Sequence, residues 1–167
     1  MLDWSDLLIR LAAATAIGGA IGLNRDLHHK AAGLRTLGLV ALVSAAVTLG
    51  AIESAGIENA TRVIQGLLTG VGFLGAGVIV RGDSGHKVHG LTTAASVWAA
   101  TAIGALCAMG LWPLIGVTAI LVLALLSFGG RLEKRLHAAL ERNERPEKDA
   151  RQADQDGDRN EVSPGGS

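Results

Sequence analysis

Residues 91–128 contain no aspartate, glutamate, lysine or arginine and lie within the longest uncharged run in the chain. A single straight helix of that length would reach roughly 57 Å, about twice the hydrocarbon thickness of a bilayer. Near its middle the run contains Gly110 and Pro113, two residues that favour a turn. The sequence therefore predicts a helical hairpin with two membrane spans, over residues 91–109 and 112–128.

Three further apolar segments have the length of a membrane span. Residues 37–52 and 63–80 carry no charge, and a helix over the latter would reach about 27 Å. The first segment, residues 7–23, contains Arg10, but Asp6 lies one helical turn earlier and can pair with it. A signal peptide would begin with basic residues, whereas this chain begins with acidic ones. The pattern predicts an all-α, polytopic membrane bundle of about five transmembrane helices.

The composition is typical of this class. Mean hydropathy is +0.38, with 49% hydrophobic but only 3% aromatic residues. Closely packed membrane helices use such mixtures of glycine, alanine and leucine. The formal net charge is zero, which argues against nucleic acid as a partner. The single cysteine, Cys107, excludes an internal disulfide and is interpreted as a small buried hydrophobic residue.

Basic residues gather in the connecting segments on one side of the predicted bundle. Segments 24–36 and 81–90 carry lysine and arginine, as does the end of the last span. On the other side, the N-terminus and the 53–62 loop are mainly acidic, and the hairpin turn is uncharged. Because positively charged loops stay in the cytoplasm, the N-terminus is expected outside and the C-terminus inside.

The chain ends in a charged tail. Residues 129–167 hold 17 of the charged residues, against 13 in residues 1–128. The apolar residues at the start of this tail recur every four positions, at Leu132, Leu136 and Leu140. This spacing predicts an amphipathic cytoplasmic helix over residues 129–145. Residues 146–167 have almost no apolar content and are expected to be disordered.

The stretch "TGVGFLGAGVIV", residues 69–80, contains glycines at the G-x-G-x-x-G spacing of dinucleotide-binding loops. Such a loop follows a strand and needs an acid about 20 residues later, whereas these glycines lie inside an apolar, helix-length run. In a membrane helix, glycines instead let another helix approach closely. We assign this packing role to Gly18, Gly22, Gly66, Gly70, Gly72, Gly75 and Gly77. The approaching helix can belong to this chain, a second copy or a partner.

Polar side chains interrupt the third and fourth predicted spans. They are Gln65, Thr69, Thr92, Thr93 and Ser96. Serine and threonine can bond to their own helix, so they signal little alone. Glutamine is harder to satisfy, and Gln65 indicates either an interhelical contact or a solute path.

Three segments of the sequence resemble the motifs of a known protein family. "AGLRT" (32–36), "GVGFLGAGVI" (70–79) and "GLTTAASVWAATAIG" (90–104) are similar to the signature of the MgtC/SapB family of bacterial inner-membrane proteins. The resemblance covers roughly residues 5–128. It implies a multi-pass protein associated with adaptation to low magnesium and with intracellular survival of pathogens. It also implies a regulator of other membrane proteins, such as membrane ATPases, rather than a magnesium pump.

The sequence departs from the family pattern at two places. Members usually carry Glu-Arg at the end of the first span, whereas this chain has Asn24 before Arg25. A cation- or proton-binding role for that carboxylate is therefore in doubt here. Several members also have a folded cytoplasmic domain after the last span, where this sequence has only the charged tail.

The candidate functional residues lie in the family motifs and at the helix ends that these motifs form. They are Arg35, Thr36, Gln65, Thr69, Arg81, Thr92, Thr93 and Ser96. Those near the predicted cytoplasmic surface could bind an anion, an anionic lipid head group or a loop of a partner. The alternative is that the arginines only anchor the helices.

Two functions remain open from the sequence. The first is a regulatory protein that docks against another membrane protein, with homo-oligomerisation expected. The second is a small-solute or cation transporter that acts as a dimer, with a path lined by the polar residues of the third and fourth spans. No nucleophile and base stand at a recognisable spacing, so an enzyme is not expected.

No cofactor or metal is expected either. Histidines occur in two predicted cytoplasmic loops, at positions 28, 29, 86 and 89. Imidazoles suit zinc, copper or nickel, whereas magnesium prefers oxygen ligands. These histidines are not part of the family signature and are interpreted as solvated loop residues.

Overall fold

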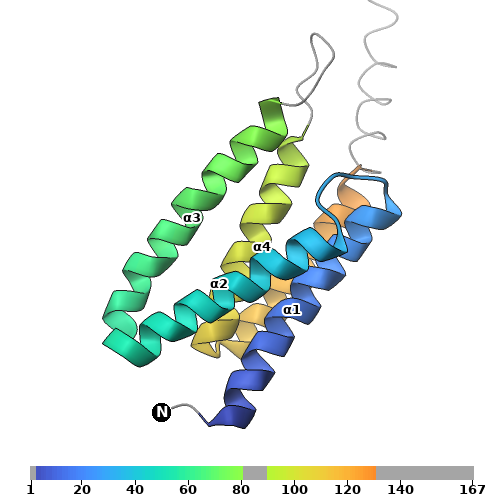
Figure 1. Cartoon of the computed structure of the whole chain (residues 1–167). Coiled ribbons are helices and arrows are strands. Elements are labelled where there is room, and N and C mark those ends of the chain that lie inside the picture. Colours follow the sequence, from blue (N-terminus) through green and yellow to red (C-terminus); the bar gives the residue numbers. More distant parts are fainter. Residues whose placement is uncertain (1–2, 81–89, 131–167) are drawn as a thin grey trace, which may run out of the picture. The chain divides into compact units, whose positions relative to one another are not determined.

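The computed structural model describes residues 3–80 and 90–130, and these residues form an all-helical membrane bundle. The four labelled helices are α1 (Trp4–Leu27), α2 (Leu34–Ala55), α3 (Ile57–Val80) and α4 (Leu91–Met109) (Figure 1). A fifth helix covers Trp112–Gly130. All five are long and apolar enough to cross a membrane, which confirms the predicted class. The predicted cytoplasmic helix from residue 131 onward and the tail lie outside the described residues.

The helices begin and end at glycines more often than at charged residues. Gly56 and Gly110 follow the last residues of α2 and α4 with positive φ angles of 79° and 71°. Only glycine adopts such angles without strain, so these residues end the helices and redirect the chain. At Gly110 the backbone N–H also bonds to the carbonyl of Cys107 at 3.1 Å. The fifth helix then begins only two residues later.

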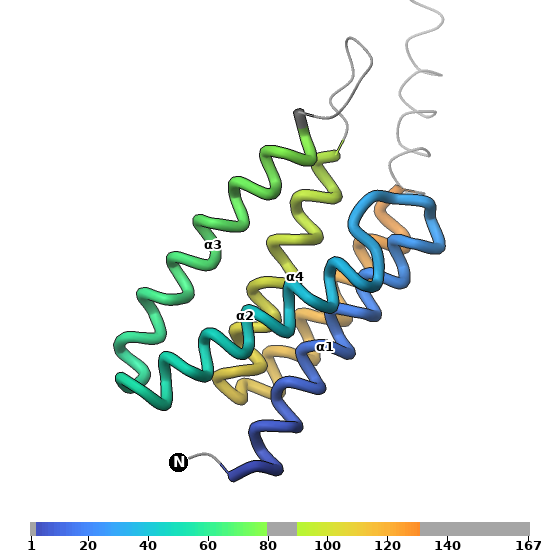
Figure 2. Tube along the Cα trace, in the orientation of Figure 1, coloured from blue at the N-terminus to red at the C-terminus, as the bar shows by residue number. Residues whose placement is uncertain are grey.

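The helices differ greatly in how much of their surface the chain itself covers. In the most apolar window of α4, 56% of the residues are buried, against 11% in α3 and 11% in the fifth helix. Helix α4 packs against α1, α2 and α3, whereas α1 and α3 lie on opposite sides of α2 and α4 (Figure 2). Helix α2 likewise packs against α1, α3 and α4, so α2 and α4 form the centre of the bundle, and α3 has a large uncovered face.

Small residues let the central helices approach almost backbone to backbone. A Cβ added at Gly104 of α4 would lie 2.3 Å from the carbonyl oxygen of Ala41 in α2. A Cβ at Gly18 of α1 would lie 2.6 Å from the Ala41 Cβ. Ala41 itself is fully buried. Helices α1 and α4 therefore meet α2 at one alanine, where neither leaves room for a methyl group.

Substitution of the two kinds of glycine separates core packing from an open surface. We expect Gly104→Ala to lower the free energy of unfolding by about 1–3 kcal/mol, because overpacking a filled site costs that much. Gly70→Ala in α3 meets no atom within 4 Å in the described chain and should raise stability by at most about 1 kcal/mol. Thermal unfolding of both variants in detergent checks this difference. Equal destabilisation would contradict the packing arrangement.

Candidate functional site

A buried arginine lies where the last turn of α1 meets the start of α4. Arg25 is only 4% exposed. Its Nη2 donates hydrogen bonds to the hydroxyl of Thr93 in α4 and, at 3.4 Å, to the carbonyl of Ala31 in the α1–α2 connection. Its Nε is also buried and has no hydrogen-bond partner in the described chain. A charged group deep in a helical bundle is costly, so this residue marks a site of interest.

The neighbouring carboxylate serves the backbone instead of the arginine. Asp26 Oδ2 accepts a hydrogen bond of 2.8 Å from the backbone N–H of Leu34, the first residue of α2. This contact satisfies one of the N–H groups that a helix start leaves unpaired. Gly33 makes room for it, because a Cβ there would lie 1.7 Å from Asp26 Oδ1. Glycine in the "AGLRT" motif is therefore required by the close approach of Asp26.

The structure brings some of the predicted site residues to this region. Thr93 and Ser96 are buried in α4, and Ser96 donates to the carbonyl of Thr92 at 2.7 Å. Arg35 and Thr36 lie exposed in the first turn of α2. Arg81 lies outside the described residues. The sequence reasoning missed Arg25, although a charged residue beside the Asn24 departure was a signal that pointed to it.

The two polar residues of α3 lie on a different surface. Gln65 and Thr69 are exposed, and the Thr69 hydroxyl donates to the Gln65 carbonyl at 2.8 Å. Thr93 and Ser96, in contrast, are buried inside the bundle. Within the described part of one chain, these four residues do not line a shared polar path.

The glycines of α3 differ in whether another helix of the described chain lies against them. Gly75 faces α4, where an added Cβ would lie 3.3 Å from the Ala94 Cβ. An added Cβ at the other four would meet nothing within 4 Å in the described chain: Gly66, Gly70, Gly72 and Gly77. Phe73, within the same stretch, is 82% exposed. With 3.6 residues per turn, Gly66, Gly70 and Gly77 fall on one side of α3 and Gly72 falls on another. We call Gly66, Gly70 and Gly77 the α3 glycine surface, and no helix of the described chain covers it.

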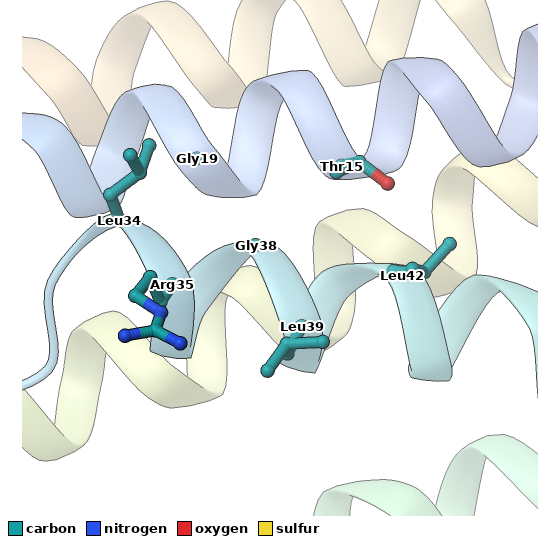
Figure 3. A pocket seen from close by; sticks show the side chains of 7 residues that line it. All are labelled: Thr15, Gly19, Leu34, Arg35, Gly38, Leu39 and Leu42. Atoms are coloured by element: carbon teal, nitrogen blue, oxygen red, sulfur yellow. The ribbon is translucent and has the colours of Figure 1, made fainter.

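A shallow groove of about 380 Å³ runs between α1 and α2. Its lining residues are Thr15, Gly19, Leu34, Arg35, Gly38, Leu39 and Leu42 (Figure 3). Gly19 and Gly38 face each other and leave the groove open, while Arg35 stands at the end near the α1–α2 connection (Figure 3). Because the lining is almost entirely apolar, the groove suits an acyl chain or an apolar side chain better than a polar solute.

A second arginine joins the first and fourth helices at the opposite end of α1. Arg10 Nη1 donates a hydrogen bond of 2.6 Å to the carbonyl of Ala108, near the end of α4. Its Nη2 lies 2.8 Å from Asp6 Oδ2, which is the pair predicted from their spacing. A helix leaves its last carbonyls without partners, so Arg10 satisfies one of them with a charged donor.

The helices and this buried polar chemistry define a multi-pass membrane protein. The model of the MgtC family matches residues 11–135, and the chain belongs to that family. It is 40% identical to Protein SrpB of Synechococcus elongatus over 79% of each chain. It is also 40% identical to Protein MgtC of Brucella abortus and of Salmonella typhimurium, over 68% and 62% of this chain.

The length covered differs between these relatives. The matched region is 47% of the Brucella protein and 43% of the Salmonella protein, so the chain spans about half the length of the MgtC relatives it matches. No solved structure matches the chain.

Among residues 3–80 and 90–130, no group of three or more His, Cys, Asp or Glu side chains is arranged to hold a metal ion.

The Arg10 contact can be tested by removing the charge while keeping the length of the side chain. Arg10→Met should lower the free energy of unfolding by about 1.5–3 kcal/mol, because a hydrogen bond from a charged donor to a buried carbonyl is lost. Thr15→Val is the control, since the Thr15 hydroxyl bonds only within its own helix, to Leu11. Thermal unfolding in detergent measures both. A stable Arg10→Met variant would show that the α1–α4 contact is dispensable.

Proposed function

We propose that this chain is a non-enzymatic regulator of other membrane proteins in the bacterial inner membrane. The observation that carries the proposal is the α3 glycine surface. Three glycines, Gly66, Gly70 and Gly77, lie on one side of a membrane-length helix without a neighbour in the described chain. Glycine lowers helix stability by roughly 0.5–1 kcal/mol relative to alanine, so three uncovered glycines on one side need a reason beyond the fold of one chain.

The core of the same protein indicates what such glycines do. Between lipid-exposed helices there is no hydrophobic driving force, so association depends on close packing and hydrogen bonds. Gly18 and Gly104 provide this packing within the chain, against Ala41. The α3 glycine surface offers the same opportunity to a helix from outside. Gln65 and Thr69, exposed on the same helix, add hydrogen-bonding groups for that helix.

The partner follows from the family resemblance. We infer that the surface binds a helix of a membrane ATPase or another inner-membrane protein, and that a second copy of the chain competes for it as a homodimer. The physiological setting would be adaptation to low magnesium, or survival of a pathogen inside host cells. Because the chain spans about half of its MgtC relatives, their full activity is part of this proposal and not a premise.

A dimeric transporter is the second candidate, and one observation favours it. Gln65 and Thr69 are exposed on α3, so two α3 helices that meet could place their polar groups along a shared path. The regulator is the better supported function, because the buried residues Thr93 and Ser96 are separated from this surface. The transporter requires a polar path that exists only when the α3 helices of two copies meet.

Blocking the α3 glycine surface should abolish association without unfolding the chain. We expect Gly70→Leu to eliminate homodimer crosslinking and the ability to restore growth in low magnesium to a strain lacking the protein. A Cβ added at Gly70 meets no atom of the described chain within 4 Å, so the unfolding temperature should remain close to that of the unchanged chain. Gly50→Leu is the matched control, because Gly50 is an equally open glycine on α2.

Two results would contradict the regulator. If Gly50→Leu loses function as Gly70→Leu does, then a large side chain at any open glycine is harmful, and the α3 glycine surface has no special role. Cation or solute flux through the reconstituted protein that disappears in Gln65→Leu would establish the transporter instead. Regulation predicts no such flux, together with recovery of a defined membrane ATPase by the unchanged chain and not by Gly70→Leu.

We also propose that the N-terminus lies outside the cytoplasm, as the distribution of basic residues predicts. Alkaline phosphatase, which is active only outside the cytoplasm, should be active when fused after Gly56, in the α2–α3 turn. A fusion after His29, in the α1–α2 connection, should be inactive. The reverse pattern would overturn the orientation.

A further inference from the structure

The buried arginine described above has no counter-charge among residues 3–80 and 90–130. Arg25 is 4% exposed, and no carboxylate within residues 3–80 and 90–130 forms an ion pair with it. The one carboxylate next to it in sequence, Asp26, accepts a hydrogen bond from the Leu34 backbone. Buried charges in proteins are paired or neutralised because an isolated one is very costly. The position therefore calls for a negatively charged group that the described residues do not provide.

The start of α4 lies beside Arg25, and it also lacks a negatively charged partner among the described residues. The residue before the helix is Gly90, which has no side chain to cap the helix, and the first turn contains no acid. The first N–H groups of a helix have no partner within the helix and carry a partial positive charge. Because Arg25 Nη2 donates to Thr93, the third residue of α4, the guanidinium lies at this first turn.

Two features therefore occur together at the start of α4. The buried Nε–H of Arg25 is a donor without an acceptor in the described part of the chain, and it lies on a guanidinium held against the first turn of α4. Asn24, the residue before Arg25, adds no charge. An acceptor with negative charge and several oxygens would satisfy the arginine and the helix start together.

We propose that Arg25 and the first turn of α4 bind a phosphate group, with Thr93 as the residue that positions the guanidinium. Phosphate has only acceptors, its tetrahedral oxygens can take hydrogen bonds from arginine and backbone N–H groups at once, and helix N-termini favour it. The group is either inorganic phosphate from solution or the phosphodiester of an acidic lipid. Both present the same chemistry to Arg25.

The first experiment measures thermal unfolding of the full chain in an uncharged detergent. Sodium phosphate should raise the unfolding temperature relative to sodium chloride at equal ionic strength, because a ligand that binds only the folded state stabilises it. Arg25→Gln should lose this rise. It should still fold, since burying a neutral glutamine costs less than burying an unpaired charge. Arg62→Gln is the control, because Arg62 is an exposed arginine on α3 and should keep the full rise.

Thr93 is tested by a pair of variants that separate positioning from packing. Thr93→Val keeps the shape of the side chain but removes the hydroxyl that accepts from Arg25, and should weaken phosphate binding about tenfold. Thr93→Ser restores the hydroxyl and should restore the affinity. A role in packing alone would give the opposite order, because valine fills the site and serine does not.

The source of the phosphate is decided in nanodiscs. If phosphatidylglycerol stabilises the chain more than phosphatidylcholine, in an Arg25-dependent way, and inorganic phosphate does not, the ligand is a lipid. If inorganic phosphate acts in phosphatidylcholine discs, the ligand is soluble. Stabilisation by neither, or stabilisation that persists in Arg25→Gln, overturns the proposal. Arg25 is far in sequence from the α3 glycine surface, and homodimer crosslinking of Arg25→Gln reports separately on the proposed regulator.

Discussion

The whole bundle depends on the close approach of α1 and α4 to α2 at Ala41. In lipid, apolar side chains gain nothing by leaving one apolar environment for another, so the helices are held by contact at short range and by hydrogen bonds. The missing side chains of Gly18 and Gly104 make that contact possible. The same approach brings the Thr101 carbonyl within 2.7 Å of the Ser44 hydroxyl, which donates to it. This one glycine-dependent contact thus determines how the core helices pack and brings Ser44 and Thr101 into hydrogen-bond distance.

This arrangement divides the helices into two kinds. Helices α1, α2 and α4 pack against each other through small residues, whereas α3 keeps three of its glycines on one outer face. The stretch with the strongest glycine pattern in the sequence is therefore in one of the least covered helices of the fold. The protein presents to the membrane the kind of surface by which its own core assembles, which is why we propose a binding role for it.

Much of the architecture could be predicted from the sequence, because the bilayer restricts the alternatives. Apolar runs of membrane length predicted the five helices, Gly110 predicted the turn, and the spacing of Asp6 and Arg10 predicted their ion pair. The surroundings of Arg25 could not be predicted in this way. Its burial depends on where α4 begins relative to the end of α1, a contact between residues 68 positions apart that no local pattern encodes. Likewise, glycine spacing reveals a face for close packing but not which helix occupies it.

The contact between Arg10 and Ala108 has a consequence for the way the chain is made. The two residues are 98 positions apart, so the carbonyl that accepts from this arginine does not exist until α4 has been synthesised. Until then, the guanidinium in the first span has only Asp6 and the membrane surface to stabilise it. Helix α1 therefore reaches its final contacts only after α2, α3 and α4 have been synthesised.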